Sequence, residues 1–335
     1  MTTELSRAPA PRDISPRPAR DAVASRPRGP CLILHNPASG ALDVPAALDA
    51  VRQTLRAAGI PCELVPIRRP RQIEALAEQQ AARALACQGT VVAAGGDGTI
   101  NAVVRGILGS GVPLGVLPMG TFNYFARNHG IPTEIGAASR VLVNGVRRPV
   151  HVGTVNDRIF LVNASLGFYP RLLEQRELAK RQFGRSRLVA LASAAVFLLR
   201  QHRHLRLRIH CDGLTEDVET GTLFVGNNRL QLEQIGLAEA ASVDRGMLAA
   251  LFTRPITSMG LLGLALRGSL GLIGEDENVT SFACREMTVS LSTRRRRPGR
   301  IKVATDGETA RLQLPLRFGV AHSRLPLLCP PDPTP

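Results

Sequence analysis

A run of glycines around one aspartate is the part of this sequence best suited to chemistry on a phosphate. Gly95, Gly96 and Gly98 follow a short apolar segment, 90–94, that is typical of a buried strand. Three missing side chains within four positions let the backbone turn sharply and approach a ligand closely. Thr99 can cap the helix that follows. A helix N-terminus placed in this way suits a phosphate, whereas a tight strand-to-helix turn without a ligand is the alternative.

Positive charge beside such a phosphate would not come from lysine. Lys180 and Lys302 are the only lysines among the 42 basic residues of the chain. A P-loop, which places a lysine on the phosphates, is therefore excluded. Backbone amides and a bound Mg²⁺ would supply the charge, and Asp97 is a candidate to hold that metal through water or to contact a nucleotide.

A second acid that could do chemistry is Asp306. It follows the apolar run 301–304 and precedes Gly307, whose missing side chain would let a substrate approach. A carboxylate there could accept a proton from a hydroxyl group, with Glu308 assisting or binding metal. Because Asp-Gly is also a common turn sequence, the spacing alone favours a plain turn.

The elements that must position these residues alternate in type over the first half of the chain. Such an alternation predicts a doubly wound parallel sheet with helices on both faces and with ligands at the carboxyl ends of its strands. The loops at Asn36 and Gly95 both follow predicted strands, so they would meet at one edge. The predicted strands are 31–35, 62–67, 90–94 and 114–117, and the predicted helices are 44–58, 71–86, 99–108, 121–128 and 134–144.

The second half of the chain consists mainly of short extended runs. This texture predicts a mostly antiparallel second domain, a β-sandwich. Helices are expected near 170–200 and 257–272. The extended runs are 150–155, 158–167, 205–211, 217–226, 247–252, 286–292 and 300–305.

Several motifs, in order along the chain after residue 30, resemble the catalytic domain of the diacylglycerol kinase family, which includes sphingosine, ceramide and bacterial lipid kinases. The glycine run alone is only moderately specific, because NAD kinases carry related forms. The segment 117–127, which reads LPMGTFNYFAR, adds most of the specificity. The further matching motifs are Asn36-Pro37-Ala38-Ser39-Gly40, Asn163-Ala164-Ser165-Leu166-Gly167-Phe168, Phe224-Val225-Gly226-Asn227-Asn228 and Asp306-Gly307-Glu308.

The resemblance implies an ATP- and Mg²⁺-dependent lipid kinase that phosphorylates a hydroxyl of diacylglycerol or a similar lipid. It implies an NAD kinase-like α/β domain over 31–148, completed by about 316–331, and a β-sandwich over 149–315 that takes the lipid. Asp306 would then be the general base with Glu308 beside it. Positions that the resemblance assigns to the nucleotide are Asn36, Pro37, Ser39, Gly40, Gly95, Gly96, Asp97, Gly98, Thr99, Asn101, Gly120, Thr121 and Asn123.

Some of these assignments have alternatives, and two positions depart from the family pattern. Thr121 would contact a phosphate or cap a helix, and Asn123 would orient its loop. Ile67 stands where the family has a nucleotide-contacting threonine, with arginines after it. Asp244 lies where some members hold a structural Mg²⁺, but Arg245 replaces a second acid, so we expect that site to be weakened or absent.

The net charge of +15 predicts an affinity for polyanions. Residues 1–30 are expected to form a disordered basic tail, and Arg294–Arg297 a hairpin tip that is either solvated or in contact with anionic lipid. Six cysteines without metal-site spacing indicate reduced thiols. We therefore expect a cytoplasmic, peripherally membrane-associated protein, with a homodimer left open.

Three other functions remain open at this stage. An NAD kinase shares the glycine run, and a degenerate relative that only binds lipid or nucleotide would fit the departures at Ile67 and Arg245. A nucleic-acid-binding protein would fit the charge. However, 4% aromatic residues and no tryptophan leave few stacking platforms for bases.

Overall fold

The computed structural model describes two compact units of the chain, each with its own sheets. The first unit extends to Val152 and resumes at Ala321, and the second is the continuous segment Gly153–Val320. The described residues are 29–37, 43–167, 204–256, 260, 263–264, 267, 271–292 and 299–331.

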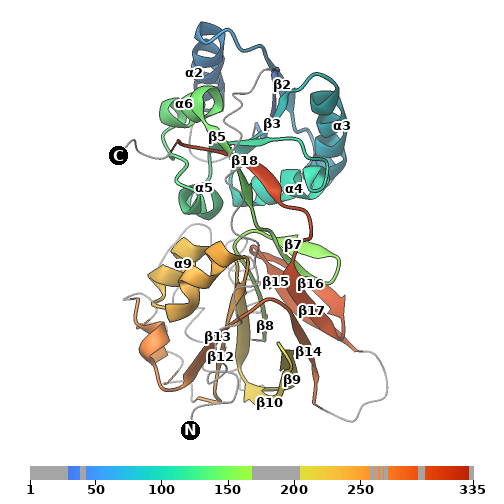
Figure 1. The fold of residues 1–335 in the computed structure, drawn as a ribbon, viewed down its shortest axis with the longest axis vertical. Helices are drawn as coiled ribbons and strands as arrows, with labels where there is room; N and C mark the ends of the chain where they lie inside the picture. The colour runs from blue at the N-terminus through green and yellow to red at the C-terminus, as the bar shows by residue number, and fades with distance from the viewer. Residues whose placement is uncertain are drawn as a thin grey trace, which may run out of the picture. The chain divides into compact units, whose positions relative to one another are not determined.

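The first unit is built on one six-stranded sheet with the strand order β2-β1-β3-β4-β18-β5 (Figure 1). Every neighbouring pair is parallel except the pair formed by β18 and the edge strand β5. β3 and β4 are buried along their whole length, as expected of central strands covered on both faces. The strands are β1 Cys31–His35, β2 Cys62–Pro66, β3 Thr90–Gly95, β4 Leu114–Pro118, β5 Val146–Val150 and β18 Leu325–Cys329.

Helices cover this sheet in two groups: α2 packs against α6, and α3 packs against α4. α2 shows why such helices form, because Asp43 caps it by accepting the Ala46 N–H at 3.2 Å and an apolar stripe faces the sheet. The helices are α2 Val44–Ala57, the short 3₁₀ turn η1 Pro70–Gln72, α3 Ile73–Ala86, α4 Asp97–Ile107, α5 Tyr124–Asn128 and α6 Ile135–Asn144.

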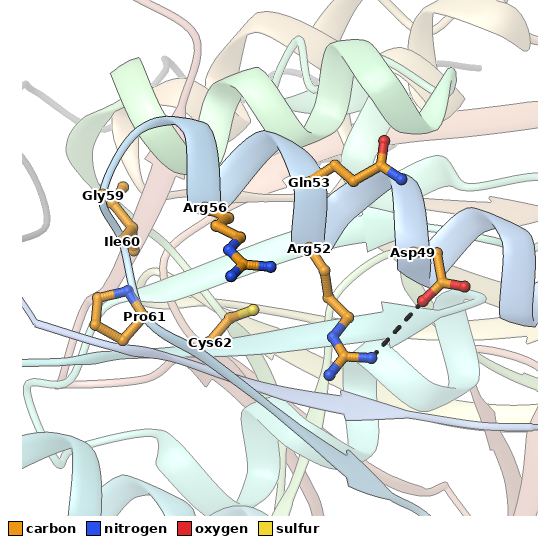
Figure 2. A pocket seen from close by; sticks show the side chains of 8 residues that line it. All are labelled: Asp49, Arg52, Gln53, Arg56, Gly59, Ile60, Pro61 and Cys62. Atoms are coloured by element: carbon orange, nitrogen blue, oxygen red, sulfur yellow. Dashed lines mark ion pairs between the residues drawn. The ribbon is translucent and has the colours of Figure 1, made fainter.

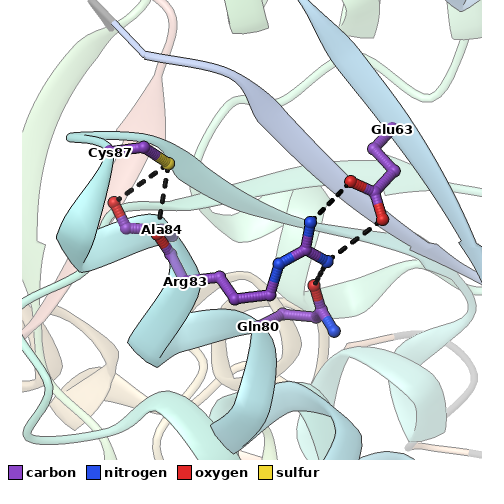
Figure 3. A network of polar contacts seen from close by, with 5 residues as sticks. All are labelled: Glu63, Gln80, Arg83, Ala84 and Cys87. Carbon is purple, nitrogen blue, oxygen red and sulfur yellow. Dashed lines mark hydrogen bonds and ion pairs between the residues drawn. The ribbon is translucent and has the colours of Figure 1, made fainter.

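The exposed edge strand β2 is fastened to α3 by a bidentate ion pair. Arg83 donates two hydrogen bonds to the carboxylate of Glu63, at 3.0 and 2.7 Å, and a third to Gln80 at 2.7 Å (Figure 3). The hydrogen bond from Arg83 lowers the pKa of Glu63, so this carboxylate stays ionised. Both side chains are about half exposed, so the pair orients the edge strand more than it stabilises the fold.

The second unit contains two six-stranded antiparallel sheets, ordered β10-β9-β14-β17-β6-β7 and β13-β12-β11-β8-β15-β16. The strands are β6 Gly153–Val155, β7 Arg158–Phe160, β8 Asn163–Gly167, β9 Leu205–Cys211, β10 Leu214–Thr220, β11 Thr222–Gly226, β12 Leu248–Thr253, β13 Val279–Cys284, β14 Met287–Leu291, β15 Arg300–Thr305, β16 Glu308–Gln313 and β17 Leu316–Val320. The helical segments are α9 Arg229–Gln234 and the 3₁₀ turns η2 Ala238–Arg245 and η3 Ile273–Glu275.

Both sheets contribute to one buried core, which makes the unit a sandwich. Ala164 and Leu166 enter it from β8, and Ile209 and Val289 enter it from the other sheet. This alternation follows from the period of two in a strand, so every second residue of β8 lies on the opposite face. A smaller core on that face includes Leu232 of α9 together with residues of η2 and β12.

The predicted fold class is confirmed, an N-terminal parallel α/β sheet followed by antiparallel sheets. One predicted boundary is wrong: β17 (316–320) pairs with β14 and β6 in the sandwich, so the chain returns to the first unit only at Ala321. β13 and β16 were not predicted, and β7 with β8, like β10 with β11, was predicted as one run. The predicted helices near 170–200 and most of 257–272, the basic tail 1–28 and the tip 293–298 lie outside the described residues.

Candidate active site

The glycine run forms the junction between β3 and α4. β3 ends at Gly95 and Gly96 is the N-cap, so α4 begins at Asp97, three residues earlier than a cap by Thr99 would require. Thr99 instead lies in the first turn and packs on Gly95, where an added Cβ would come within 2.7 Å of it. The first-turn amides of α4 have no acceptors within the helix. The expected anion-binding geometry is therefore present at this junction.

The two predicted glycine motifs lie against each other, backbone to backbone. The Met119 N–H donates to the Gly95 carbonyl at 3.0 Å. A Cβ added to Gly120 would lie 2.6 Å from the Cα of Gly96, so no larger residue fits between them. Because β3 and β4 are parallel neighbours, their carboxyl ends bring these two motifs to the same edge of the sheet.

Asp97 fastens α4 to the second motif. Its carboxylate accepts the backbone N–H groups of Tyr124 and Phe125 at 3.2 and 3.1 Å, which are the orphan amides at the start of α5. Sequence reasoning missed this role, since nothing in the spacing indicates that an acid 27 residues away caps α5.

Asn123 holds the second motif in its shape. Its side chain accepts the Gly120 N–H and donates to the Gly120 carbonyl, both at 2.9 Å. Its own φ of 51° lies in the left-handed region, which asparagine tolerates. Thr121 is exposed and does not cap α5, whose N-cap is Asn123, so the capping alternative for Thr121 is wrong.

The loop after β1 lies at the same edge. The Asn36 N–H donates to the Ala94 carbonyl of β3 at 3.4 Å, so Asn36 and Pro37 adjoin the glycine run. Asn101 is buried one turn into α4, with 8% of its surface exposed. Ser39 and Gly40, the remaining predicted members of this loop, lie outside the described residues.

His35, the last residue of β1, provides a pH-dependent feature of this edge. Burial lowers the pKa of His35 below its usual 6.5. The unfolded chain then binds a proton more readily than the folded protein. The free energy of unfolding that depends on neutral His35 is therefore fully present above pH 6.5 and is lost as the pH falls below that value.

We expect the thermal midpoint to fall between about pH 7 and 5.5, and to fall less in a His35→Asn variant. Calorimetry across this range measures both slopes. His322→Asn is the matched control, because His322 is exposed and its loss should leave the slope unchanged. An unaltered slope in His35→Asn would show that another group causes the dependence.

The predicted acid of the second unit lies in a hairpin turn. Asp306 and Gly307 are the two residues between β15 and β16, and their φ values of 47° and 87° are positive as in a type I′ turn. The backbone of Asp306 and Gly307 therefore forms the plain turn that the Asp-Gly sequence indicates. Whether Asp306 could also act on a substrate depends on its side chain.

The carboxylate of Asp306 is held by three backbone amides. Leu161 donates to one oxygen at 2.7 Å, and Val162 and Asn163 donate to the other at 2.9 and 3.0 Å. These bonds fill three of roughly four acceptor positions and favour the ionised form. Asp306 is thus firmly placed, but these donors weaken it as a proton acceptor. Glu308 is exposed at the start of β16.

Asp244 is engaged by an arginine. Its carboxylate accepts a hydrogen bond from Arg229 at 2.6 Å, and the same guanidinium donates to Glu233, also at 2.6 Å. Arg245 donates to Ser242 at 2.9 Å. Among the described residues, no group of three or more acidic, histidine or cysteine side chains could hold a metal. A guanidinium therefore ties α9 to η2 at the position considered for a structural Mg²⁺.

Chelation provides a test of this substitution. Removing divalent cations with EDTA is expected to leave the thermal midpoint of the nucleotide-free protein unchanged, because Arg229 supplies the positive charge that joins these acids. Differential scanning fluorimetry with and without EDTA measures it. A clear drop that added Mg²⁺ reverses would show that a structural metal is present after all.

Comparisons with known proteins agree with this geometry. A family model described as the diacylglycerol kinase catalytic domain matches residues 30–155. A Pseudomonas aeruginosa protein named "Probable lipid kinase YegS-like" is 32% identical over 251 residues, which cover 72% of this chain and 78% of that protein. The chain belongs to the diacylglycerol kinase and YegS-like lipid kinase family.

Two further relatives show how far this likeness reaches. Bacillus subtilis diacylglycerol kinase is 51% identical over 74 residues, 21% of this chain and 24% of that protein. A crystal structure of a diacylglycerol kinase from Bacillus anthracis has a TM-score of 0.65 at 18% identity, covering 90% of this chain and 97% of the other. That likeness shows the fold. Members of the lipid kinase family take a nucleotide substrate.

No helix in the described part of the chain is long and apolar enough to cross a bilayer.

All six cysteines are free thiols, and burial, with a smaller contribution from Cys62, raises the pKa of Cys31 to about 12. The Cys31 thiol is therefore unreactive at neutral pH.

Proposed function

We propose that this protein is an ATP-dependent lipid kinase that transfers the γ-phosphoryl group to a hydroxyl of diacylglycerol or a similar lipid. The observation that carries the proposal is the locked pair of loops at the N-terminus of α4. Gly96 and Gly120 contact each other, and Asp97 fixes both loops to the start of α5. Family membership supplies the lipid part of the proposal.

The phosphates of ATP bind to backbone amides in this proposal. The first turn of α4 offers N–H groups and the positive end of the helix dipole. Gly98 is exposed there, and a Cβ added to it would meet no atom within 4 Å outside its own helix backbone and chain neighbours. A rigid loop of this kind acts mainly by positioning the phosphates and by neutralising charge, which is most of what phosphoryl transfer requires.

Mg²⁺ accompanies the nucleotide in this proposal. It usually keeps several waters and is held by one or two carboxylates together with the phosphates, so a full protein cage is not needed. Asp97 is the carboxylate of the glycine run, and its two amide bonds leave about half of its acceptor positions for the metal or its water. The bound metal would neutralise charge that develops on the phosphates.

Asp306 is proposed as the general base, with Glu308 beside it. As a bond forms between the lipid oxygen and the γ-phosphorus, the bond from that phosphorus to the bridging oxygen breaks and ADP leaves. The proton of the lipid hydroxyl passes to the carboxylate of Asp306, which its three amide donors hold in place. The basic surface would keep the protein on anionic membrane where its lipid is found.

An ATP-consumption assay with product analysis tests the function. The purified protein is given ATP and Mg²⁺ with mixed micelles of diacylglycerol, sphingosine, ceramide or monoacylglycerol, and separately with NAD. We expect a phosphorylated lipid and ADP in equal amounts. Phosphorylation of NAD instead would identify an NAD kinase. ATP binding without any product in the whole panel would identify a degenerate relative.

A further inference from the structure

Two arginines lie at the edge of the first-unit sheet where the nucleotide is proposed to bind. β2 is parallel to β1, and the Ile67 N–H donates to the His35 carbonyl at 2.8 Å, which places Ile67 beside Asn36. The next two residues, Arg68 and Arg69, continue past the carboxyl end of β2 and are exposed.

The backbone around this pair is fixed on both sides. Ile67 is 5% exposed and anchors the end of β2 in the core. Pro70 opens the η1 turn, and Arg69 before it is extended with φ and ψ of −137° and 125°. The link between β2 and the η1 turn is thus only three residues long, Ile67 to Arg69. Because the backbone of both arginines is already fixed, a ligand would have to order only their side chains.

These guanidiniums have no partner within the described part of the chain. No hydrogen bond or ion pair there joins Arg68 or Arg69 to an acid, in contrast to Arg83 and Arg105, which pair with Glu63 and Glu74. Asp97, the acid of the proposed site, is already engaged by the amides of α5. Positive charge is therefore left uncompensated at this edge.

We propose that Arg68 and Arg69 bind the phosphate chain of the nucleoside triphosphate. This inference rests on the function proposed above. β2 lies two strands from β3, about 10 Å in the hydrogen-bonding direction, so the two side chains can reach toward phosphates that the α4 terminus holds. A guanidinium binds phosphate with two parallel hydrogen bonds. The pair supplies the side-chain charge that a lysine-free glycine loop lacks.

The test is a double variant, Arg68→Gln with Arg69→Gln, which removes both charges and keeps polar side chains. We expect KM for ATP, and Kd for ADP measured by calorimetry, to rise about 10- to 100-fold, because charge-assisted hydrogen bonds are lost. The kcat and the KM for lipid are expected to stay unchanged, since the contact is the same in the ground and transition states. The thermal midpoint should not move, as both side chains are exposed.

The chain offers a matched control near the other end of β2, where this strand begins. Arg52 and Arg56 of α2 line a surface pocket of about 640 Å³ beside Cys62, the first residue of β2 (Figure 2). Changing this pair to glutamine removes the same charge from the same unit. We expect its KM for ATP and Kd for ADP to match the wild-type values.

The outcomes separate this inference from the proposed function. If the wild type turns over ATP and lipid but the Arg68 and Arg69 variant keeps its nucleotide affinity, the arginine contact is wrong and the kinase stands. Equal losses in the variant and the control would show a general effect of net charge and would also overturn it. If the wild type binds neither ATP nor ADP, the proposed function and this inference both fail.

Discussion

A Gly98→Ala variant is expected to stay folded and to lose about 100-fold in kcat/KM for ATP. The position is in the first turn of α4, and an added Cβ meets nothing within 4 Å. Alanine should even stabilise the helix by about 0.5–1 kcal/mol. The methyl group nevertheless enters the space proposed for phosphate, and displacement of a reacting group by about 1 Å costs that much rate. Urea unfolding and steady-state kinetics measure the two effects.

Gly120→Ala is the contrasting variant, because its Cβ would lie 2.6 Å from the Cα of Gly96. Backbone there has to move, so we expect a loss of about 1–3 kcal/mol in stability together with a loss of activity. We therefore expect Gly98→Ala to lose activity but keep its stability, and Gly120→Ala to lose both activity and stability. Normal turnover in Gly98→Ala would mean that the phosphates do not bind at this turn.

An Asp306→Asn variant is expected to lose both stability and catalysis. Asparagine accepts the left-handed conformation of this turn position, so the backbone is preserved. Its amide NH₂, however, faces an N–H donor of the 161–163 segment, which should cost about 1–3 kcal/mol. If Asp306 is the general base, kcat falls by a further factor of about 10²–10⁴.

Kinetics at a temperature where the variant is fully folded separate these losses, and intact mass confirms that the new Asn-Gly has not deamidated. Glu308→Gln is the matched control, because Glu308 is exposed in the same hairpin and its loss should leave stability unchanged. Should folded Asp306→Asn turn over at the normal rate, its carboxylate would be a structural anchor only. A loss of kcat in the control alone would transfer the role to Glu308.

Much of the fold was predictable because it depends on local pattern. The strands at 31–35 and 300–305 were predicted with their observed bounds, since apolar, β-branched runs between turn residues determine them directly. The glycine run likewise predicted a strand, a turn and a helix N-terminus. The start of α4 was misplaced because a glycine N-cap has no side chain to signal it, while Thr99 resembled a cap.

Sequence order could not determine which distant groups meet. β17 and β18 follow each other closely, yet β17 joins the sandwich and β18 the parallel sheet. Each strand pairs with neighbours that are far from it in the sequence, β17 with β14 and β6, and β18 with β4 and β5. The link from Asp97 to α5 and the three amides on Asp306 also join segments far apart in the chain. At Asp244 the local signal was Arg245, but the guanidinium that engages this carboxylate is that of Arg229, which also pairs with Glu233 one turn along α9.

The sequence by itself determined the chemistry available to this protein: a lysine-free glycine turn, an Asp-Gly hairpin and an arginine-rich surface. Only the tertiary structure decided that Asp97 and Asn123 hold the two glycine motifs together, where we propose that phosphate binds. The reason is physical. Residue types and local periodicity are properties of a short window, whereas a buried acceptor takes whichever backbone donor the packing of the whole unit brings to it.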